Sequence, residues 1–243
     1  MAFVSAVSVL STASAVSAEP AASAEASTPS RLARLSRPSR PSRHVEREGE
    51  VRAADLLAAV RGCRQISHGR YRADNGARAD IPVCAQRGAV HWKADLDVDC
   101  DGRAGRHCNR RTDPFFQPAT AQPQSDGRPL SAERLPYVVV PGASRVWNPA
   151  RSGIRGGTVA ALVHRDRIQY AVVGDTGPSD LIGEASYAAA RGLGIDPDPV
   201  RGGAGGEVTY VLFPGTTARP IESRSAAAAD GRAAARKLLR RTG

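Results

Sequence analysis

Short apolar runs between Gly- and Pro-containing turns most constrain what this 243-residue chain can fold into. The runs are rich in Val, Ile, Tyr and Phe, which favour strands over helices. They predict strands over residues 89–98, 137–140, 158–163, 168–173 and 208–213. The tight connection between the third and fourth of these predicts a hairpin. With only short helices predicted, over 55–60 and 184–191, we expect a mainly β fold: a compact, single-domain β-barrel with a few short helices.

The N-terminal part differs in composition from the middle. Residues 1–18 are small and apolar and end in Val16-Ser17-Ala18, a small-x-small pattern that predicts a secretory signal peptide. A disordered Ala/Ser leader is the alternative. Residues 19–50 are rich in Ala, Ser and Pro, with Arg at every third position from Arg31 to Arg43. They cannot bury enough apolar surface to fold, so we predict a disordered linker, with contact to an anionic cell surface as the alternative.

The C-terminal residues 225–243 are Ala-rich and strongly basic. They can form a helix, but Leu238 and Leu239 are their only large apolar residues. We therefore predict a basic flexible tail, and a folded domain over residues 51–224.

The formal charge of +10, from 34 Lys and Arg against 24 Asp and Glu, first points to a nucleic-acid partner. Its distribution argues otherwise, because residues 225–243 carry +4 of it, whereas residues 90–101 carry −3 and residues 173–200 carry −4. Two acidic segments favour a cationic partner. No run of eighteen apolar residues follows the first twenty positions. We expect neither a nucleic-acid nor a membrane partner.

Four cysteines lie early in the folded domain. In a secreted chain an even number predicts disulfides, and proximity favours Cys63 with Cys84 and Cys100 with Cys108 among three connectivities. A zinc site is the alternative, but it lacks a Cys-x-x-Cys pair.

Residues 91–102 place an acid at every second position. On a strand, this spacing puts Asp95, Asp97 and Asp99 on one face. Three neighbouring carboxylates repel one another, so a bound metal or an ammonium-bearing ligand would stabilise them.

The same stretch matches the opening of a calcium loop over residues 97–102, but the twelfth position holds Cys108 instead of Glu. An EF-hand is therefore not expected. A partial calcium site and simple turn capping by individual aspartates are the alternatives.

A second acidic pair follows an apolar strand. Asp175 stands at the end of that strand, Gly177 and Pro178 turn the chain, and Glu184 is expected to open a helix. Paired carboxylates are what glycoside hydrolysis requires, one as acid and one as base or nucleophile. Aromatic rings for sugar contacts are available, although aromatic residues are more often core: Trp92, Tyr137, Trp147 and Tyr187.

Four blocks of the chain stand in the order found in a known enzyme family. They are KADLDVDCDG at 93–102, PYVVVP at 136–141, YAVVGDTGP at 170–178 and IGEASY at 182–187. Over about residues 92–213, the chain closely resembles the fungal-type endo-chitosanases, glycoside hydrolase family 75. The resemblance implies a secreted endo-hydrolase that cuts the β-1,4 links of chitosan with inversion at the anomeric carbon.

The family's essential Asp and Glu fall on Asp175 and Glu184, so residues 51–224 would be the catalytic domain. We expect Glu184 as acid and Asp175 as base, although sequence spacing leaves the roles open. The expected substrate contacts are Asp95, Asp97, Asp99, Trp92 and Tyr187. We expect chitosan as the partner of a monomeric chain, with no cofactor and no metal.

Two other function classes fit parts of the sequence. Asp-Thr-Gly at 175–177 is also the aspartic-protease triplet, but it occurs once here, whereas those enzymes need two. A non-catalytic module that binds wall polysaccharide would use the same acidic face. The Asp-Thr-Gly turn also resembles those of double-psi barrels, which gives the expected barrel a possible topology.

Overall fold

The structure is a computed structural model that describes residues 50–241. The predicted signal peptide and nearly all of the predicted linker lie outside these residues. The helices are α1 Ala53–Ala59, α2 Tyr187–Leu193 and α3 Arg224–Arg240, with a 3-10 turn, η1, at Pro149–Ser152. The strands are β1 Arg64–Gln65, β2 Cys84–Gln86, β3 Ala89–Asp99, β4 Tyr137–Pro141, β5 Thr158–His164, β6 Arg167–Gly177, β7 Glu184–Ser186 and β8 Ala204–Thr217.

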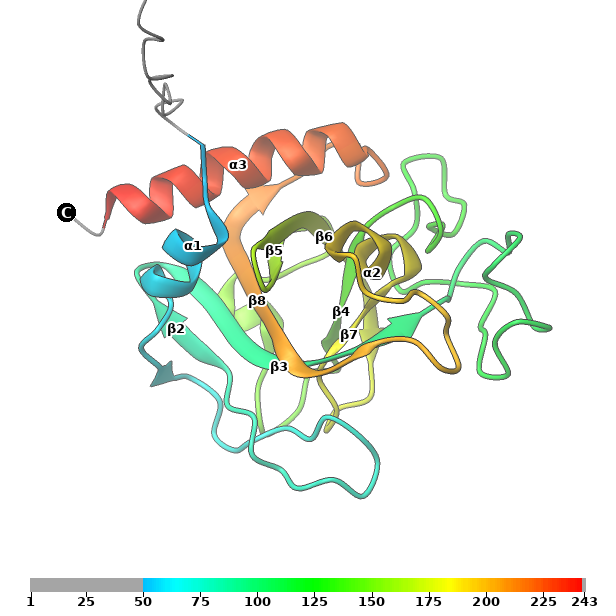
Figure 1. Cartoon of the computed structure of the whole chain (residues 1–243), viewed down its shortest axis with the longest axis horizontal. Coiled ribbons are helices and arrows are strands. Elements are labelled where there is room, and N and C mark those ends of the chain that lie inside the picture. The colour runs from blue at the N-terminus through cyan, green and yellow to red at the C-terminus, as the bar shows by residue number, and fades with distance from the viewer. Residues whose placement is uncertain (1–49, 242–243) are drawn as a thin grey trace, which may run out of the picture. The chain divides into compact units, whose positions relative to one another are not determined.

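Six of the strands close into a barrel (Figure 1). Their order is β3-β7-β4-β6-β5-β8, and β8 pairs back onto β3. The pairs β3–β7 and β4–β6 are parallel, and the other pairs of the ring are antiparallel. β1 and β2 extend the sheet from β3. The predicted mainly β barrel and the predicted β5–β6 hairpin are confirmed.

Side chains alternate between two hydrophobic clusters because successive strand residues point to opposite faces. On β5, Val159, Ala161 and Val163 belong to a cluster that includes α1 and α3. The intervening Ala160 and Leu162 belong to a cluster that includes α2. Both faces of the barrel wall are therefore covered along this strand.

The prediction of a flexible C-terminal tail is wrong. Residues 224–240 form α3, which packs on β5, β6 and β8 (Figure 1). Its buried face consists mostly of small residues at helical spacing: Ala227, Gly231, Ala235 and Leu238. A Cβ on Gly231 would lie 2.4 Å from the Tyr170 ring, so the glycine lets the helix approach β6 closely. The folded domain therefore continues past residue 224.

The second predicted helix begins later than expected. Glu184 lies on β7, whose backbone pairs with β3, and the helix α2 begins at Tyr187. The Ser186 hydroxyl caps α2 by accepting a hydrogen bond from the Ala189 amide at 3.2 Å. Glu184 is thus held by a strand pair, not by a helix start.

Both predicted disulfides are present. Cys63 bonds Cys84, and Cys100 bonds Cys108. The second closes a short loop directly after β3. Within residues 50–241, no helix is both long and apolar enough to span a membrane.

Candidate active site

Adjacent strands bring Asp175 and Glu184 together. β4 lies between β6 and β7, with Val139 opposite Asp175. β7 pairs with β4 on one side and with β3 on the other, and the pairing with β3 places Glu184 directly beside Asp97. Burial is the main cause of the raised pKa of Glu184, and the charge of Asp175 contributes to it, so the two carboxyl groups lie near each other.

Asp175 is buried and hydrogen-bonded. The residue is only 7% exposed. One oxygen, Oδ1, accepts hydrogen bonds from the Ala121 amide at 2.8 Å and the Thr176 amide at 2.7 Å. Burial raises the pKa of Asp175, and the two amides oppose that rise. Such donors favour the charged carboxylate, which suits a base.

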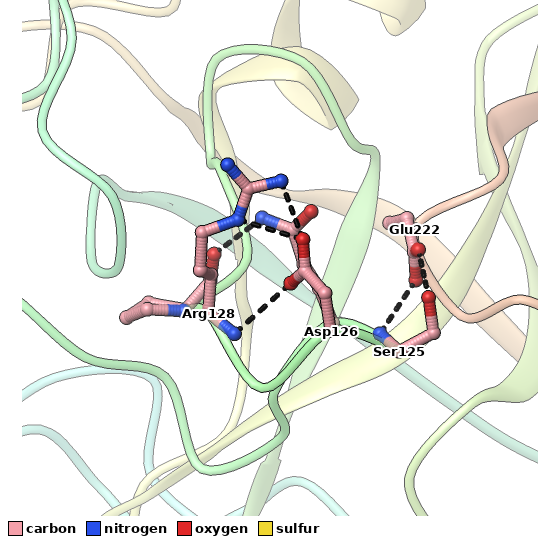
Figure 2. Close-up of polar contacts among 6 residues, drawn as sticks. Ser125, Asp126, Arg128 and Glu222 are labelled. Carbon is pink, nitrogen blue, oxygen red and sulfur yellow. Dashed lines mark hydrogen bonds and ion pairs between the residues drawn. The ribbon is translucent and has the colours of Figure 1, made fainter.

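The loop that donates from Ala121 is tied down at several points. The Gln122 amide donates to the Gly174 carbonyl at 3.2 Å. Farther along, the amide and hydroxyl of Ser125 both donate to the Glu222 carboxylate, just before α3 (Figure 2). The α3 end of the domain therefore holds the loop that orients Asp175.

Glu184 has a different environment. It is partly buried, and among residues 50–241 no hydrogen-bond donor reaches its carboxylate. Burial raises its pKa to about 7, with further contributions from the charges of Asp97, Asp101 and Asp175. A carboxyl group of this kind keeps its proton close to neutral pH and can act as an acid.

Asp99 and Asp101 lie beside Asp175. Oxygens of the three carboxylates lie within 4.8 Å of one another. The Tyr137 hydroxyl contacts Asp99 Oδ1 at 3.2 Å and the Asp101 carbonyl at 3.0 Å. Burial raises the pKa of Asp99 well above its usual range and that of Asp101 to about 6.

A second acidic cluster consists of Asp74, Asp95 and Asp97, again with oxygens within 4.8 Å of one another. Burial, together with Asp97 and Asp74, raises the pKa of Asp95 to about 7. Either cluster could hold a cation. Asp97 and Asp99, the first two positions of the calcium-loop pattern, belong to different clusters.

The expected role of Trp92 in substrate binding does not agree with its position. Trp92 is 1% exposed. Its ring stacks on Tyr210 with centroids 5.2 Å apart and meets Trp147 edge-on at 6.2 Å. It is a core residue with no free face for a sugar, because Tyr210 and Trp147 pack against its ring.

Tyr187 is 9% exposed and belongs to the hydrophobic core. Its ring stacks on His107 with centroids 5.4 Å apart. Both residues line an open pocket of about 610 Å³ together with residues 196–201. The pocket lies next to α2, whose first residue is Tyr187.

Sequence reasoning missed several groups of this site. Asp74 lies in a loop that is distant in sequence from the acidic strand, and no local sequence pattern marks it. Asp101 continued the alternation that selected Asp95, Asp97 and Asp99, and could have been included on that signal. The amide of Ala121 carries no sequence signal, because any residue except proline supplies one.

Comparison with known proteins gives the family. A sequence model described as fungal chitosanase of glycosyl hydrolase group 75 matches residues 96–243, more than half of the chain. Endo-chitosanase C of Aspergillus oryzae is 29% identical over 175 residues, which cover 68% of this chain and 43% of that protein. Endo-chitosanase B of A. oryzae strain ATCC 42149 / RIB 40 is 31% identical over 137 residues, covering 53% of this chain and 57% of that protein.

The chain thus spans about half the length of the curated relatives it matches. Among solved structures, a Streptomyces papain inhibitor aligns with a TM-score of 0.33 and 18% identity, over 55% of this chain and 99% of that one. The family match contains Asp175 and Glu184 and continues through α3, which the resemblance seen in the sequence had left out. The chain belongs to the fungal chitosanase family, glycosyl hydrolase group 75.

Proposed function

We propose that this protein is a secreted, endo-acting glycoside hydrolase that cleaves the β-1,4 links of chitosan. Family membership and the endo-chitosanase names of its relatives support this activity. The observation that carries the proposal is the contrast between two neighbouring carboxyl groups. Asp175 has two amide donors, whereas Glu184 has none and a pKa of about 7. Acid and base are the two roles that glycoside hydrolysis requires.

The proposed mechanism is a single displacement. Glu184 donates its proton to the glycosidic oxygen as the bond from that oxygen to the anomeric carbon breaks. A water molecule attacks the anomeric carbon from the opposite face of the ring, and Asp175 accepts the proton that the water loses. The new reducing end has the α configuration, because the attack inverts the β link. Glu184 regains its proton from solvent and Asp175 releases its own.

The acidic surface supports a cationic substrate. Asp95, Asp97 and Asp99 lie on the strand that passes Glu184, and chitosan carries an amine on each glucosamine unit. We assign these aspartates to substrate binding, together with Tyr187, which lines an open pocket. We leave Trp92 out because it is 1% exposed and its ring packs against Tyr210 and Trp147. Electrostatic attraction of this kind speeds association and favours the charged polymer over neutral ones.

Release of new reducing ends from chitosan tests the proposal. Wild type, Asp175→Asn and Glu184→Gln are compared, with Asp166→Asn as the control, since Asp166 is an exposed residue of the β5–β6 turn. We expect activity in wild type and the control and a loss of about 100-fold or more in the two site variants. Binding of chitosan by wild type without new reducing ends would instead favour the wall-binding module. Full activity in either site variant would refute the site assignment.

A further inference from the structure

We infer that Asp74, Asp95 and Asp97 form a pocket for the 2-ammonium group of one glucosamine unit, and that this contact distinguishes deacetylated from acetylated units. The inference rests on the proposed function, since it concerns the same substrate and the same face of β3. It adds Asp74, a loop residue, to the acidic strand, and it gives the pocket one ligand group.

The geometry of the three carboxylates fits an ammonium group. One oxygen from each lies within 4.8 Å of the other two. An ammonium has three N–H donors, and charge-assisted hydrogen bonds are about 2.8 Å long. Three oxygens at that distance from one nitrogen, in tetrahedral directions, lie about 4.6 Å from one another. The pocket therefore offers one acceptor for each donor.

The pocket lacks a cation of its own. Asp95 is 8% exposed, and its Oδ1 is buried without a hydrogen-bond partner. In the part of the chain from 50 to 241, no Lys or Arg forms an ion pair with any of the three aspartates. A buried carboxylate oxygen without a partner is unfavourable. A cation bound by the cluster would offset the charge of this buried carboxylate.

The pocket adjoins the proposed acid. A Cβ on Gly183 would lie 2.0 Å from Asp95 Oδ1, so the absence of a side chain there makes room for the carboxylate. Gly183 directly precedes Glu184, and Asp97 pairs with Glu184 across the two strands. An ammonium held here belongs to a sugar close to the bond that is cut.

An ammonium group fits better than a metal ion. Asp74 and Asp97 are exposed, so the pocket is open to a polymer. Calcium takes six to eight oxygen ligands, whereas this cluster provides three carboxylates. Acetylation removes the positive charge and two of the three N–H donors, so an acetylated unit loses these contacts.

Calorimetric titration tests the inference on variants that cannot hydrolyse the ligand. Glu184→Gln is compared with the double variants Asp74→Asn/Glu184→Gln and Asp80→Asn/Glu184→Gln. Asp80 is the matched control, an exposed aspartate of the same loop that lies outside the cluster. The ligands are the glucosamine hexamer, the N-acetylglucosamine hexamer and calcium chloride alone. Thermal melts show whether each variant is folded.

We expect Asp74→Asn to weaken binding of the glucosamine hexamer roughly tenfold. Asp80→Asn should have no effect on this binding. Binding of the acetylated hexamer should be equal in all variants. Equal effects of Asp74→Asn on both hexamers, or no effect on either, would overturn the inference. Micromolar calcium binding that Asp74→Asn abolishes, with hexamer binding unchanged, would also overturn it in favour of a metal site.

Reducing-end release by wild type separates the two proposals. Selective binding of the glucosamine hexamer without hydrolysis would refute only the enzymatic function. Hydrolysis without selective binding would refute only the pocket.

Discussion

Asp97 on β3 and Glu184 on β7 are direct partners in a parallel strand pair. Paired positions on adjacent strands are only about 5 Å apart, so the fold forces two acidic side chains together. Burial raises the pKa of Glu184 to about 7, and the charge of Asp97 contributes to the rise. The sheet register therefore prepares Glu184 to hold a proton.

The pH dependence of kcat/KM for glucosamine oligomers should reflect this pairing. Glu184 must be protonated to act, so activity should fall as the pH rises through about 7. Asp175 must be ionised, so activity should also fall on the acid side, at a pH above the usual carboxylate range. Asp97→Asn removes one cause of the raised pKa of Glu184 and should move the alkaline limb to lower pH. Because both enzymes are assayed on the same substrate, titration of the substrate amine affects both alike. An unmoved alkaline limb would contradict the proposed acid.

Asp95→Asn should stabilise the protein at alkaline pH. The pKa of Asp95 is raised to about 7 in the folded protein, against an ordinary value near 4. Its ionisation therefore opposes folding, with no effect below about pH 4, a growing one up to about pH 7 and the full effect above that. We expect the variant to gain about 1 to 3 kcal/mol in free energy of unfolding at pH 8. Urea unfolding at pH 8 and pH 4 measures this difference, and an equal gain at both values would show that ionisation is not the cause.

Glu222→Ala should slow the reaction without abolishing it. The variant loses the two Ser125 hydrogen bonds that hold the loop carrying the Ala121 donor (Figure 2). We expect a loss of about 0.5 to 1.5 kcal/mol in stability and a several-fold lower kcat at unchanged KM.

The matched control for this loop is Asp126→Asn, which removes the local ion pair with Arg128 and leaves Ser125 and Glu222 in place (Figure 2). It should have little effect on kcat. Equal kcat values in Glu222→Ala and wild type would show that the Ser125 contact does not position Asp175.

Gly231→Ala should destabilise the protein, although alanine is the better helix former by about 1 kcal/mol. The added Cβ would lie 2.4 Å from the Tyr170 ring, and overpacking a core contact typically costs about 1 to 3 kcal/mol. Gly205→Ala on β8 is the control, since nothing lies within 4 Å of its Cβ position. Thermal unfolding should show a lower Tm for Gly231→Ala alone. A higher Tm would mean that α3 does not pack closely against Tyr170 at Gly231.

Five of the six barrel strands could be predicted, because β-branched and aromatic residues mark them directly; β7 could not. The docking of α3 could not, since apart from Leu238 its buried face consists of alanines and a glycine, which look like an unpacked surface in sequence. Close approach to Tyr170 at Gly231 adds to the contact that Leu238 makes.

Only part of the candidate site could be predicted from the sequence. Asp175 and Glu184 could be identified from their sequence motifs and the family resemblance. Asp74 joins the acidic strand only through tertiary folding. Trp92 was misassigned because an aromatic residue on a strand can be a core residue or a sugar contact, and its sequence position does not distinguish the two. The assignment of Glu184 to a helix start failed because β7 is only three residues long, too short to give a period.

The most direct test of the central claim is proton NMR of wild-type protein with the glucosamine hexamer, recorded in the first minutes, before mutarotation equilibrates the products. The proposed acid and base on opposite faces of the ring predict that new reducing ends appear first as the α anomer. No new reducing-end signal, or a β anomer formed first, would contradict the claim.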